Sequence, residues 1–231
     1  TVDVVISDPP YSDYVHSKSR RGGKDAPALD GSGHAVPSSF SRVKEFGFDA
    51  LTPRLRLDVA HWVAARCRRW SLIFSDVESS NLWRDELVGQ GIDYVRTGAW
   101  VKIGATPQFT GDRPAIGFEA ITICHPPGRK RWNGGGTHAI WQHAIVLNRS
   151  HSAPRLHTTQ KPELLLAELV ALFSEPGETI CDPFLGSGTT AAAAKRQGRK
   201  CIGIELEERY CEIAANRLQQ EAFQFQEQAH D

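Results

Sequence analysis

The sequence contains no methionine, and neither charge is in excess because 27 Lys and Arg residues balance 27 Asp and Glu residues. It also lacks an apolar run long enough to cross a membrane, and its five cysteines include no Cys-x-x-Cys pair. An odd number of cysteines without such a pair argues against a disulfide framework and against a zinc site. We therefore expect a globular protein with buried free thiols in a reducing compartment, no metal, and no overall attraction to polyanions.

The length of 231 residues allows one large domain or two small ones, and 40% hydrophobic with 23% charged residues is ordinary for a folded protein. Local clusters of Lys and Arg still allow a basic face, although solvated surface charge is the better interpretation of any single cluster. The chain begins within a strand-like run, so we expect that further residues precede Thr1 in the natural protein.

The most informative stretch is Asp8-Pro9-Pro10-Tyr11, which follows the apolar residues 4–6. A short β-branched run that stops at two prolines predicts a buried strand ending in a rigid corner, because each proline fixes φ and lacks an N–H. Ligands bind at the carboxyl ends of strands in open α/β sheets. A carboxylate, free carbonyls and a ring would suit a flat group with an exocyclic NH2, such as a nucleobase. On its own, the motif fits a Pro-rich turn equally well.

The middle of the chain alternates between helical and strand-like spacing. A helix is predicted after Pro53, and apolar runs predict strands at residues 71–74, 94–101 and 118–124. Residues 12–47 have no periodicity and follow the corner directly. We interpret them as a mobile lid that closes on a substrate, with disordered filler as the alternative.

Residues 126–154 form a second irregular stretch, rich in glycine and in groups that bind nucleic acids. Basic, amide and indole groups on such a loop are the ones needed for phosphate and base-edge contacts. An exposed loop anchored by its tryptophans is an equally good interpretation. The candidate DNA-binding residues are Arg129, Lys130, Arg131, Trp132 and Asn133 here, and Lys18, Arg20 and Arg21 in the lid.

The last third of the chain alternates helices and strands, which is the pattern of a parallel sheet. After the strand-like residues 179–181, Gly186, Gly188 and Ala191 fit the G-x-G-x-x-G/A spacing of a nucleotide-binding turn. Glu205 ends the next predicted strand, where an acidic residue accepts hydrogen bonds from ribose hydroxyls. This combination is far more specific than a lone Gly-x-Gly.

The residues that lead into the glycine turn indicate which nucleotide binds. A dinucleotide site leaves the helix N-terminus free for pyrophosphate, whereas here Asp182 precedes the turn. A carboxylate repels phosphate and attracts an ammonium group, which favours S-adenosylmethionine. Its amino group would pair with Asp182, its ribose with Glu205, and its carboxylate with Thr159 or Lys161.

Four motifs in this order resemble the DNA amino-methyltransferases that methylate N6 of adenine or N4 of cytosine. They are Asp8-Pro9-Pro10-Tyr11, His157-Thr158-Thr159-Gln160-Lys161-Pro162, Asp182-Pro183-Phe184-Leu185-Gly186-Ser187-Gly188-Thr189, and Glu205. The catalytic motif comes before the cofactor motif, as in the β class of that family. The resemblance implies a Rossmann-like S-adenosylmethionine-dependent methyltransferase fold, a mostly parallel α/β sheet of seven strands with helices on both faces. The strand expected before Val4, which would contact the cofactor adenine, is absent from the sequence.

The resemblance also implies that three segments of the chain have different roles. Residues 1–125 would form the catalytic half, 126–156 the target-recognition region and 157–231 the cofactor-binding half. Asp8, Pro9, Pro10 and Tyr11 would be catalytic, and Phe184, Ser187, Gly188 and Thr189 would join the cofactor contacts. The implied setting is the bacterial or phage cytoplasm, near the nucleoid, with double-stranded DNA as partner and restriction-modification as the context. The short recognition region suggests a homodimer, which would help to cover a DNA site.

An Asp at the first position of the catalytic motif goes mostly with adenine in that family, so N6 of adenine is the first choice of target. The alternatives are an N4-cytosine enzyme and a non-catalytic DNA-binding relative. An RNA or protein amide methyltransferase and an NAD-dependent oxidoreductase rank lower, the latter because Asp182 would repel pyrophosphate.

Overall fold

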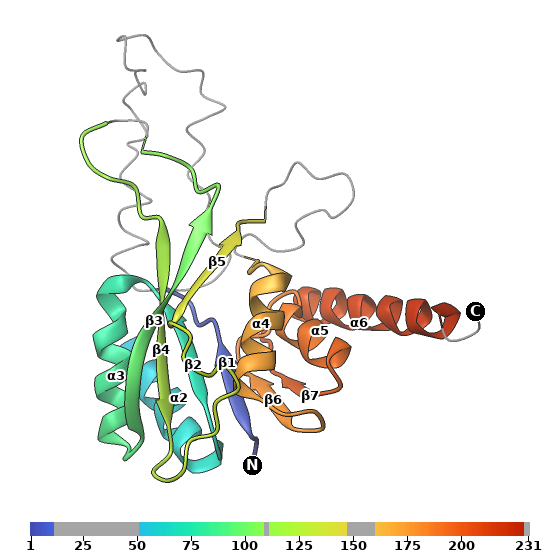
Figure 1. Cartoon of the computed structure of the whole chain (residues 1–231), viewed down its shortest axis with the longest axis horizontal. Helices are drawn as coiled ribbons and strands as arrows, with labels where there is room; N and C mark the ends of the chain where they lie inside the picture. Colours follow the sequence, from blue (N-terminus) through green and yellow to red (C-terminus); the bar gives the residue numbers. More distant parts are fainter. Residues whose placement is uncertain (12–50, 109–110, 147–159, 229–231) are drawn as a thin grey trace.

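The computed structural model describes residues 1–11, 51–108, 111–146 and 160–228 and is built on a seven-stranded sheet of order β5-β3-β4-β2-β1-β6-β7 (Figure 1). Every strand pairing is parallel except the two made by β4, which runs antiparallel to both β2 and β3. The strands are β1 (Val4–Ser7), β2 (Ser71–Ser75), β3 (Asp93–Ile103), β4 (Phe118–His125), β5 (Ile140–Ala144), β6 (Thr179–Asp182) and β7 (Lys200–Gly203). The predicted mostly parallel sheet of seven strands is confirmed.

Helices cover both faces of the sheet, as predicted (Figure 1). They are α2 (Pro53–Arg66), α3 (Ser80–Gly89), α4 (Glu163–Phe173), α5 (Thr189–Arg196) and α6 (Glu208–Gln228), with a 3-10 turn η2 (Val77–Ser79). Side chains alternate along β1, so Val4 and Ile6 pack with α4 and α5 while Val5 packs with α2 and α3. Both hydrophobic layers therefore meet at β1, the strand that ends at Asp8.

Local sequence signals explain where several helices begin. Pro53 starts α2, and the Thr52 hydroxyl accepts a hydrogen bond from the Leu55 N–H, as expected of an N-cap. Asp76 caps η2 in the same way by accepting from the Ser79 N–H. Over the described parts of the chain, no helix combines the length and the apolar character needed to cross a membrane.

The structure corrects one predicted segment. β5 lies inside the stretch that was expected to be irregular, and it pairs with β3 through Trp100 and Trp141. Its sequence has no clear period of two, so the strand depends on tertiary packing. Gly98 of β3 makes that packing possible, because a Cβ there would lie 2.6 Å from the Trp141 ring.

Candidate active site

The predicted catalytic corner and the predicted cofactor turn lie at the same edge of the sheet. β1 and β6 are adjacent and parallel, with Val5 beside Cys181. Their carboxyl ends therefore deliver Asp8 and Asp182 side by side. The two halves of the chain therefore contribute strands to one sheet and residues to one edge of it.

Asp8 is held by a lysine from the far end of the sequence. Lys161 Nζ lies 2.5 Å from Asp8 Oδ2, and the Lys161 side chain is only 7% exposed. The other oxygen, Asp8 Oδ1, is buried and has no hydrogen-bond partner among the described residues. A buried acceptor without a partner is costly, so its presence at a strand end indicates a ligand position.

Lys161 also reaches Glu119, which lies on β4 opposite Trp100 of β3. Lys161 Nζ is 3.2 Å from Glu119 Oε2, and Lys102 Nζ is 2.6 Å from Glu119 Oε1. Asp8, Lys161, Glu119 and Lys102 thus form a chain of alternating charges. Sequence analysis missed Glu119, although a single charged residue within an otherwise apolar strand was a usable signal.

Aromatic rings surround the Lys161 ammonium. Its nitrogen lies 5.2 Å from the centre of the Phe74 ring, 5.6 Å from Tyr11 and 5.9 Å from Trp100. The Tyr11 hydroxyl is 3.5 Å from the same nitrogen. The corner is therefore a low-dielectric site in which each charge depends on its neighbours.

These surroundings shift the pKa of each member. Burial raises the pKa of Asp8, an effect that Lys161 opposes and Glu119 reinforces. Burial alone would lower the pKa of Lys161 and raise that of Glu119. The two carboxylates nevertheless raise the pKa of Lys161, and the two lysines lower that of Glu119. Burial and the nearby carboxylates raise the pKa of Tyr11 well above its ordinary value, so its hydroxyl stays neutral.

The glycine turn has the backbone that its sequence predicts. Gly186 has φ 53° and Gly188 has φ 80°, which is left-handed geometry that favours glycine. The Gly186 N–H donates to Glu205 Oε2 at 2.8 Å, and the space into which a Gly186 Cβ would point is open. A ligand can approach the backbone there with the Glu205 carboxylate beside it, which fits a nucleoside.

Asp182 is buried and holds the turn together. Its oxygens accept from the Thr190 hydroxyl at 2.6 Å and from the Phe184 N–H at 3.1 Å. Burial is the main cause that raises its pKa to about 7. A cation such as a ligand ammonium would favour the ionised form.

The other predicted cofactor residues differ in where they lie. Ser187 and Thr189 are buried and bonded to Arg217, so they fix the turn to α6, while Phe184 is half-buried against the α2 side of the core. The Lys161 ammonium pairs with Asp8 and Glu119, so the structure places it beside Asp8. Thr159 lies outside the described residues.

The basic segment 129–133 is not beside the catalytic corner. β4 runs antiparallel, so the residues after His125 leave from the opposite edge of the sheet. There the Arg131 carbonyl accepts from the Trp70 indole N–H, and the Asn133 amide donates to two carbonyls at the end of α4. Lys130 pairs with Asp93. The structure therefore does not place this segment beside Asp8, and its contact with DNA stays a prediction. The lid, residues 12–47, with Lys18, Arg20 and Arg21, lies outside the described residues.

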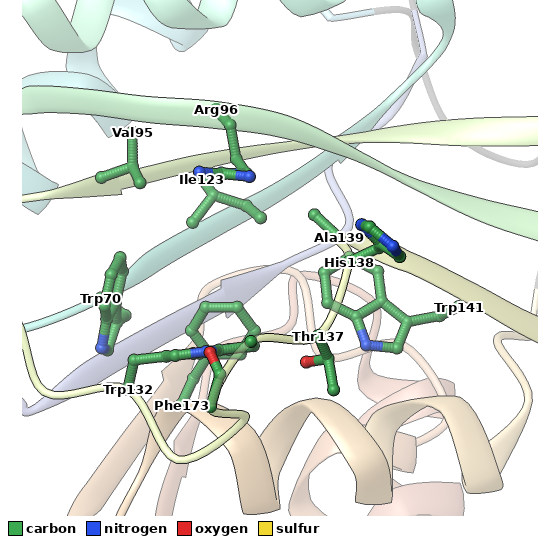
Figure 2. Close-up of a pocket in the computed structure, with 12 residues that line it drawn as sticks. Trp70, Val95, Arg96, Ile123, Trp132, Thr137, His138, Ala139, Trp141 and Phe173 are labelled. Atoms are coloured by element: carbon green, nitrogen blue, oxygen red, sulfur yellow. The ribbon is translucent and has the colours of Figure 1, made fainter.

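A cavity of about 430 Å³ lies against the same segment. Figure 2 shows Val95, Arg96 and Ile123 of the sheet on one side and Trp132, Trp141 and Phe173 on the other. The cavity shares no lining residue with the corner around Asp8. Trp70, Trp141 and Phe173 are themselves core residues, at 4%, 2% and 2% exposure. This cavity is a packing feature between sheet and α4, and we assign no chemistry to it.

A different element stands beside the corner. The described parts of the connection between β3 and β4, residues 104–108 and 111–117, rise above the carboxyl edge of the sheet (Figure 1). Its flanks expose Ile103 and Ile116, and it carries Arg113. We call this segment the β3–β4 arm.

Known sequences that are similar to this chain are those of methyltransferases. A sequence profile for a family of N6 and N4 methyltransferases, described as DNA methylase, matches residues 84–216, more than half of the chain. The Type II methyltransferase M.HinfI of Haemophilus influenzae is 28% identical over 157 residues, which cover 61% of this chain and 44% of that protein. The Type II methyltransferase M2.DpnII of Streptococcus pneumoniae is 51% identical over 65 residues, 28% of this chain and 24% of that protein. The chain thus spans less than half the length of these relatives.

Solved structures share the fold. The crystal structure of an M1.HpyAVI–SAM complex matches with a TM-score of 0.65 and 21% identity, covering 94% of this chain and 89% of that one. The cytosine-N4-specific PvuII DNA methyltransferase matches with a TM-score of 0.66 and 15% identity, covering 93% and 78%. The Rossmann-like methyltransferase fold is confirmed.

Proposed function

Because the chain belongs to the DNA methylase family of N6 and N4 methyltransferases, we propose that it methylates N6 of adenine at specific sites in double-stranded DNA. The methyl donor would be S-adenosylmethionine. The observation that carries the proposal is the unpartnered Asp8 Oδ1, a buried acceptor next to a lysine that occupies the other oxygen.

The corner would act on the amino group of the base. That nitrogen is a poor nucleophile because its lone pair is delocalised into the ring. Asp8 Oδ1 and the Pro9 carbonyl would accept its two hydrogens and draw the nitrogen towards tetrahedral geometry. The Asp8 carboxylate would also stabilise the positive charge that develops on the nitrogen as its bond to the methyl group forms and the bond from that methyl to sulfur breaks, leaving a neutral thioether. The nitrogen would then release one of its two protons, to Asp8 or to water.

Positioning of the base amino group against the sulfonium methyl group would account for most of the remaining rate gain. No covalent enzyme intermediate would form. An amino group inside a duplex cannot reach a buried strand end, so the base must be flipped out. The Tyr11 ring, half-buried at the mouth of the corner, would stack on it. The β3–β4 arm stands at the edge across which the duplex would lie, which makes it the better candidate for DNA contacts.

The cofactor would bind at the neighbouring strand ends. The bound cofactor supplies a sulfonium methyl group that is open to direct displacement. Glu205 would accept bonds from the ribose, and the backbone of Gly186 would lie against the nucleoside. Asp182 would attract the amino group, which favours its ionised form despite a pKa of about 7.

N4 of cytosine is the second candidate, since both targets present the same NH2 and a fold relative is described as cytosine-N4-specific. Asp8 favours adenine through the family correlation. A non-catalytic relative is the less favoured alternative because Asp8, Pro9, Tyr11 and the Gly186 turn are all intact. The homodimer, the restriction partner and the cytoplasmic setting stay predictions.

The test is methyl transfer from labelled S-adenosylmethionine to mixed-sequence DNA, followed by mass analysis of the nucleosides. We expect N6-methyladenine from the wild type and no product from Asp8→Ala, with cofactor affinity largely kept. Asp58→Ala removes an exposed carboxylate on α2 and should behave as wild type. Transfer by Asp8→Ala at the wild-type rate, or N4-methylcytosine as product, would overturn the proposal or its choice of base.

A further inference from the structure

Glu119 is a buried carboxylate that no motif explains. The residue is 7% exposed on the interior strand β4, where an ionised carboxylate is costly unless it is paired. Lys102 pairs with one oxygen at 2.6 Å, which would satisfy the charge locally. The second oxygen faces Lys161 instead, 3.2 Å away, so Glu119 also belongs to the catalytic corner.

The geometry of Lys161 depends on this second contact. A lysine ammonium is a rotatable group with three donors on a flexible chain. Here it lies between two carboxylates, 2.5 Å from Asp8 Oδ2 and 3.2 Å from Glu119 Oε2. These two contacts, a hydrogen bond to Asp8 and an ion pair with Glu119, fix the nitrogen where it meets only one oxygen of Asp8. With the Glu119 contact gone, the ammonium would be free to approach both oxygens of Asp8.

We propose that Glu119 is a positioning residue for the methyl transfer, holding Lys161 on Asp8 Oδ2 so that Oδ1 stays free for the target amino group. This role rests on the proposed function of Asp8. Glu119 itself would not touch the base or the cofactor.

Glu119 acts on Asp8 in two ways that can be separated. Its negative charge repels that of Asp8 directly and favours the protonated form, while Lys161 favours the ionised form. Removing the charge of Glu119 should therefore lower the pKa of Asp8, and removing the charge of Lys161 should raise it. The charged and titratable groups that face this network are Lys161, Glu119, Lys102, Tyr11, Asp76 and Asp182.

The experiment measures single-turnover methyl transfer by the whole chain from pH 5 to 9. For Glu119→Gln we expect a plateau rate reduced by roughly 10- to 100-fold, the effect of one lost charge-assisted contact. Its acid limb should move to lower pH, because the repulsion on Asp8 is gone. Lys161→Gln should also be slow, with its acid limb at higher pH. Opposite displacements are not expected from a loss of packing.

Glu119→Asp tests the length of the side chain separately from its charge, since it keeps the charge but shortens the side chain. We expect a slower plateau with the acid limb near that of the wild type. Asp85→Asn removes an exposed charge on α3 and serves as control. Thermal unfolding and cofactor titration of each variant check that fold and cofactor site are intact.

The outcomes keep the two proposals apart. If the wild type methylates DNA and Asp8→Ala does not, but Glu119→Gln matches the wild type in plateau and pH profile, the positioning role is wrong and the function stands. The same holds if Glu119→Gln and Lys161→Gln move the acid limb in the same direction. Full methyltransferase activity of Asp8→Ala would instead contradict both the proposed function of Asp8 and the positioning role of Glu119.

Discussion

Lys161 Nζ lies 2.5 Å from Asp8 Oδ2, although 153 positions separate the two residues in the chain. Asp8 comes from the end of β1, and Lys161 comes just before α4, which packs on one face of that strand. The contact joins the first and third parts of the sequence at one edge of the sheet. Several consequences of this arrangement can be measured.

The Tyr11 ring should contribute to DNA binding through stacking. Stacking of a base on an aromatic ring is worth about 1–3 kcal/mol, so Tyr11→Ala should raise the KM for DNA by roughly 5- to 150-fold. Tyr11→Phe keeps the ring and loses the hydroxyl, which lies 3.5 Å from Lys161 and donates to Glu119, so its KM for DNA should stay close to wild type. Equal KM values for Tyr11→Ala and the wild type would show that the ring does not meet the base.

The Asp8 corner and the Gly186 turn could be predicted because each depends on local backbone chemistry. Two prolines fix the corner, and glycines at positive φ fix the turn, whatever surrounds them. These features need no knowledge of distant contacts.

Glu119 and the segment 129–133 could not be placed in this way, for one shared reason. Both depend on the direction of β4, the single strand among the seven that runs antiparallel. Its direction brings Glu119 to the catalytic edge and sends Arg131 and Asn133 to the opposite one. Apolar periodicity predicts that a strand exists, but it does not give its direction.

Asp182 should make stability depend on pH. Its pKa of about 7 in the folded chain exceeds the ordinary value of 3.8. Well below pH 4 the Asp182 carboxyl is protonated in both the folded and the unfolded chain. Between pH 4 and 7 it is ionised in the unfolded chain but still protonated in the folded one, so the free energy of unfolding falls as the pH rises. The shift corresponds to a loss on the order of 4 kcal/mol.

Urea unfolding of the wild type and Asp182→Asn at several pH values measures this effect. The difference in unfolding free energy should move in favour of the variant as the pH rises from 4 to 7. Asp58→Asn, at an exposed site, should follow the wild-type curve. Parallel curves for Asp182→Asn and the wild type would contradict the raised pKa.

Arg113 on the β3–β4 arm should contact DNA, and Arg129 at the opposite edge should not. Each phosphate contact adds about 0.9 to the slope of log affinity against log salt. Arg113→Gln should therefore reduce the slope by about one, while Arg129→Gln leaves it unchanged. Fluorescence anisotropy with a labelled duplex over a range of salt concentrations measures both. A reduced slope for Arg129→Gln and an unchanged slope for Arg113→Gln would instead identify residues 129–133 as the DNA-binding segment.

Asn133 should stabilise the fold and not bind DNA. Its side-chain amide donates to the carbonyls of Ala171 and Ser174, which end α4. Asn133→Ala should lower the free energy of unfolding by about 1–2 kcal/mol, with DNA affinity unchanged. Asn133→Asp cannot donate and places a negative charge at a helix C-terminus, so it should be at least as destabilising. A loss of DNA affinity without a loss of stability would contradict this role.

Alanine at Gly186 and alanine at Gly188 should have different main effects, one on cofactor affinity and the other on stability. Left-handed geometry costs any other residue about 1–2 kcal/mol, so both variants should be less stable. A Cβ at Gly188 would lie 2.9 Å from the Ala214 Cβ, which adds roughly 1–3 kcal/mol for overpacking against α6. A Cβ at Gly186 meets no atom within 4 Å, but it would occupy the open space that we assign to the nucleoside.

Gly188→Ala should therefore show the larger loss in unfolding free energy. Gly186→Ala should show the larger loss in S-adenosylmethionine affinity relative to its loss of stability, as measured by calorimetric titration. Each variant serves as the control for the other because both carry the same backbone strain. If Gly186→Ala binds the cofactor as tightly as the wild type, the nucleoside does not lie against this part of the turn.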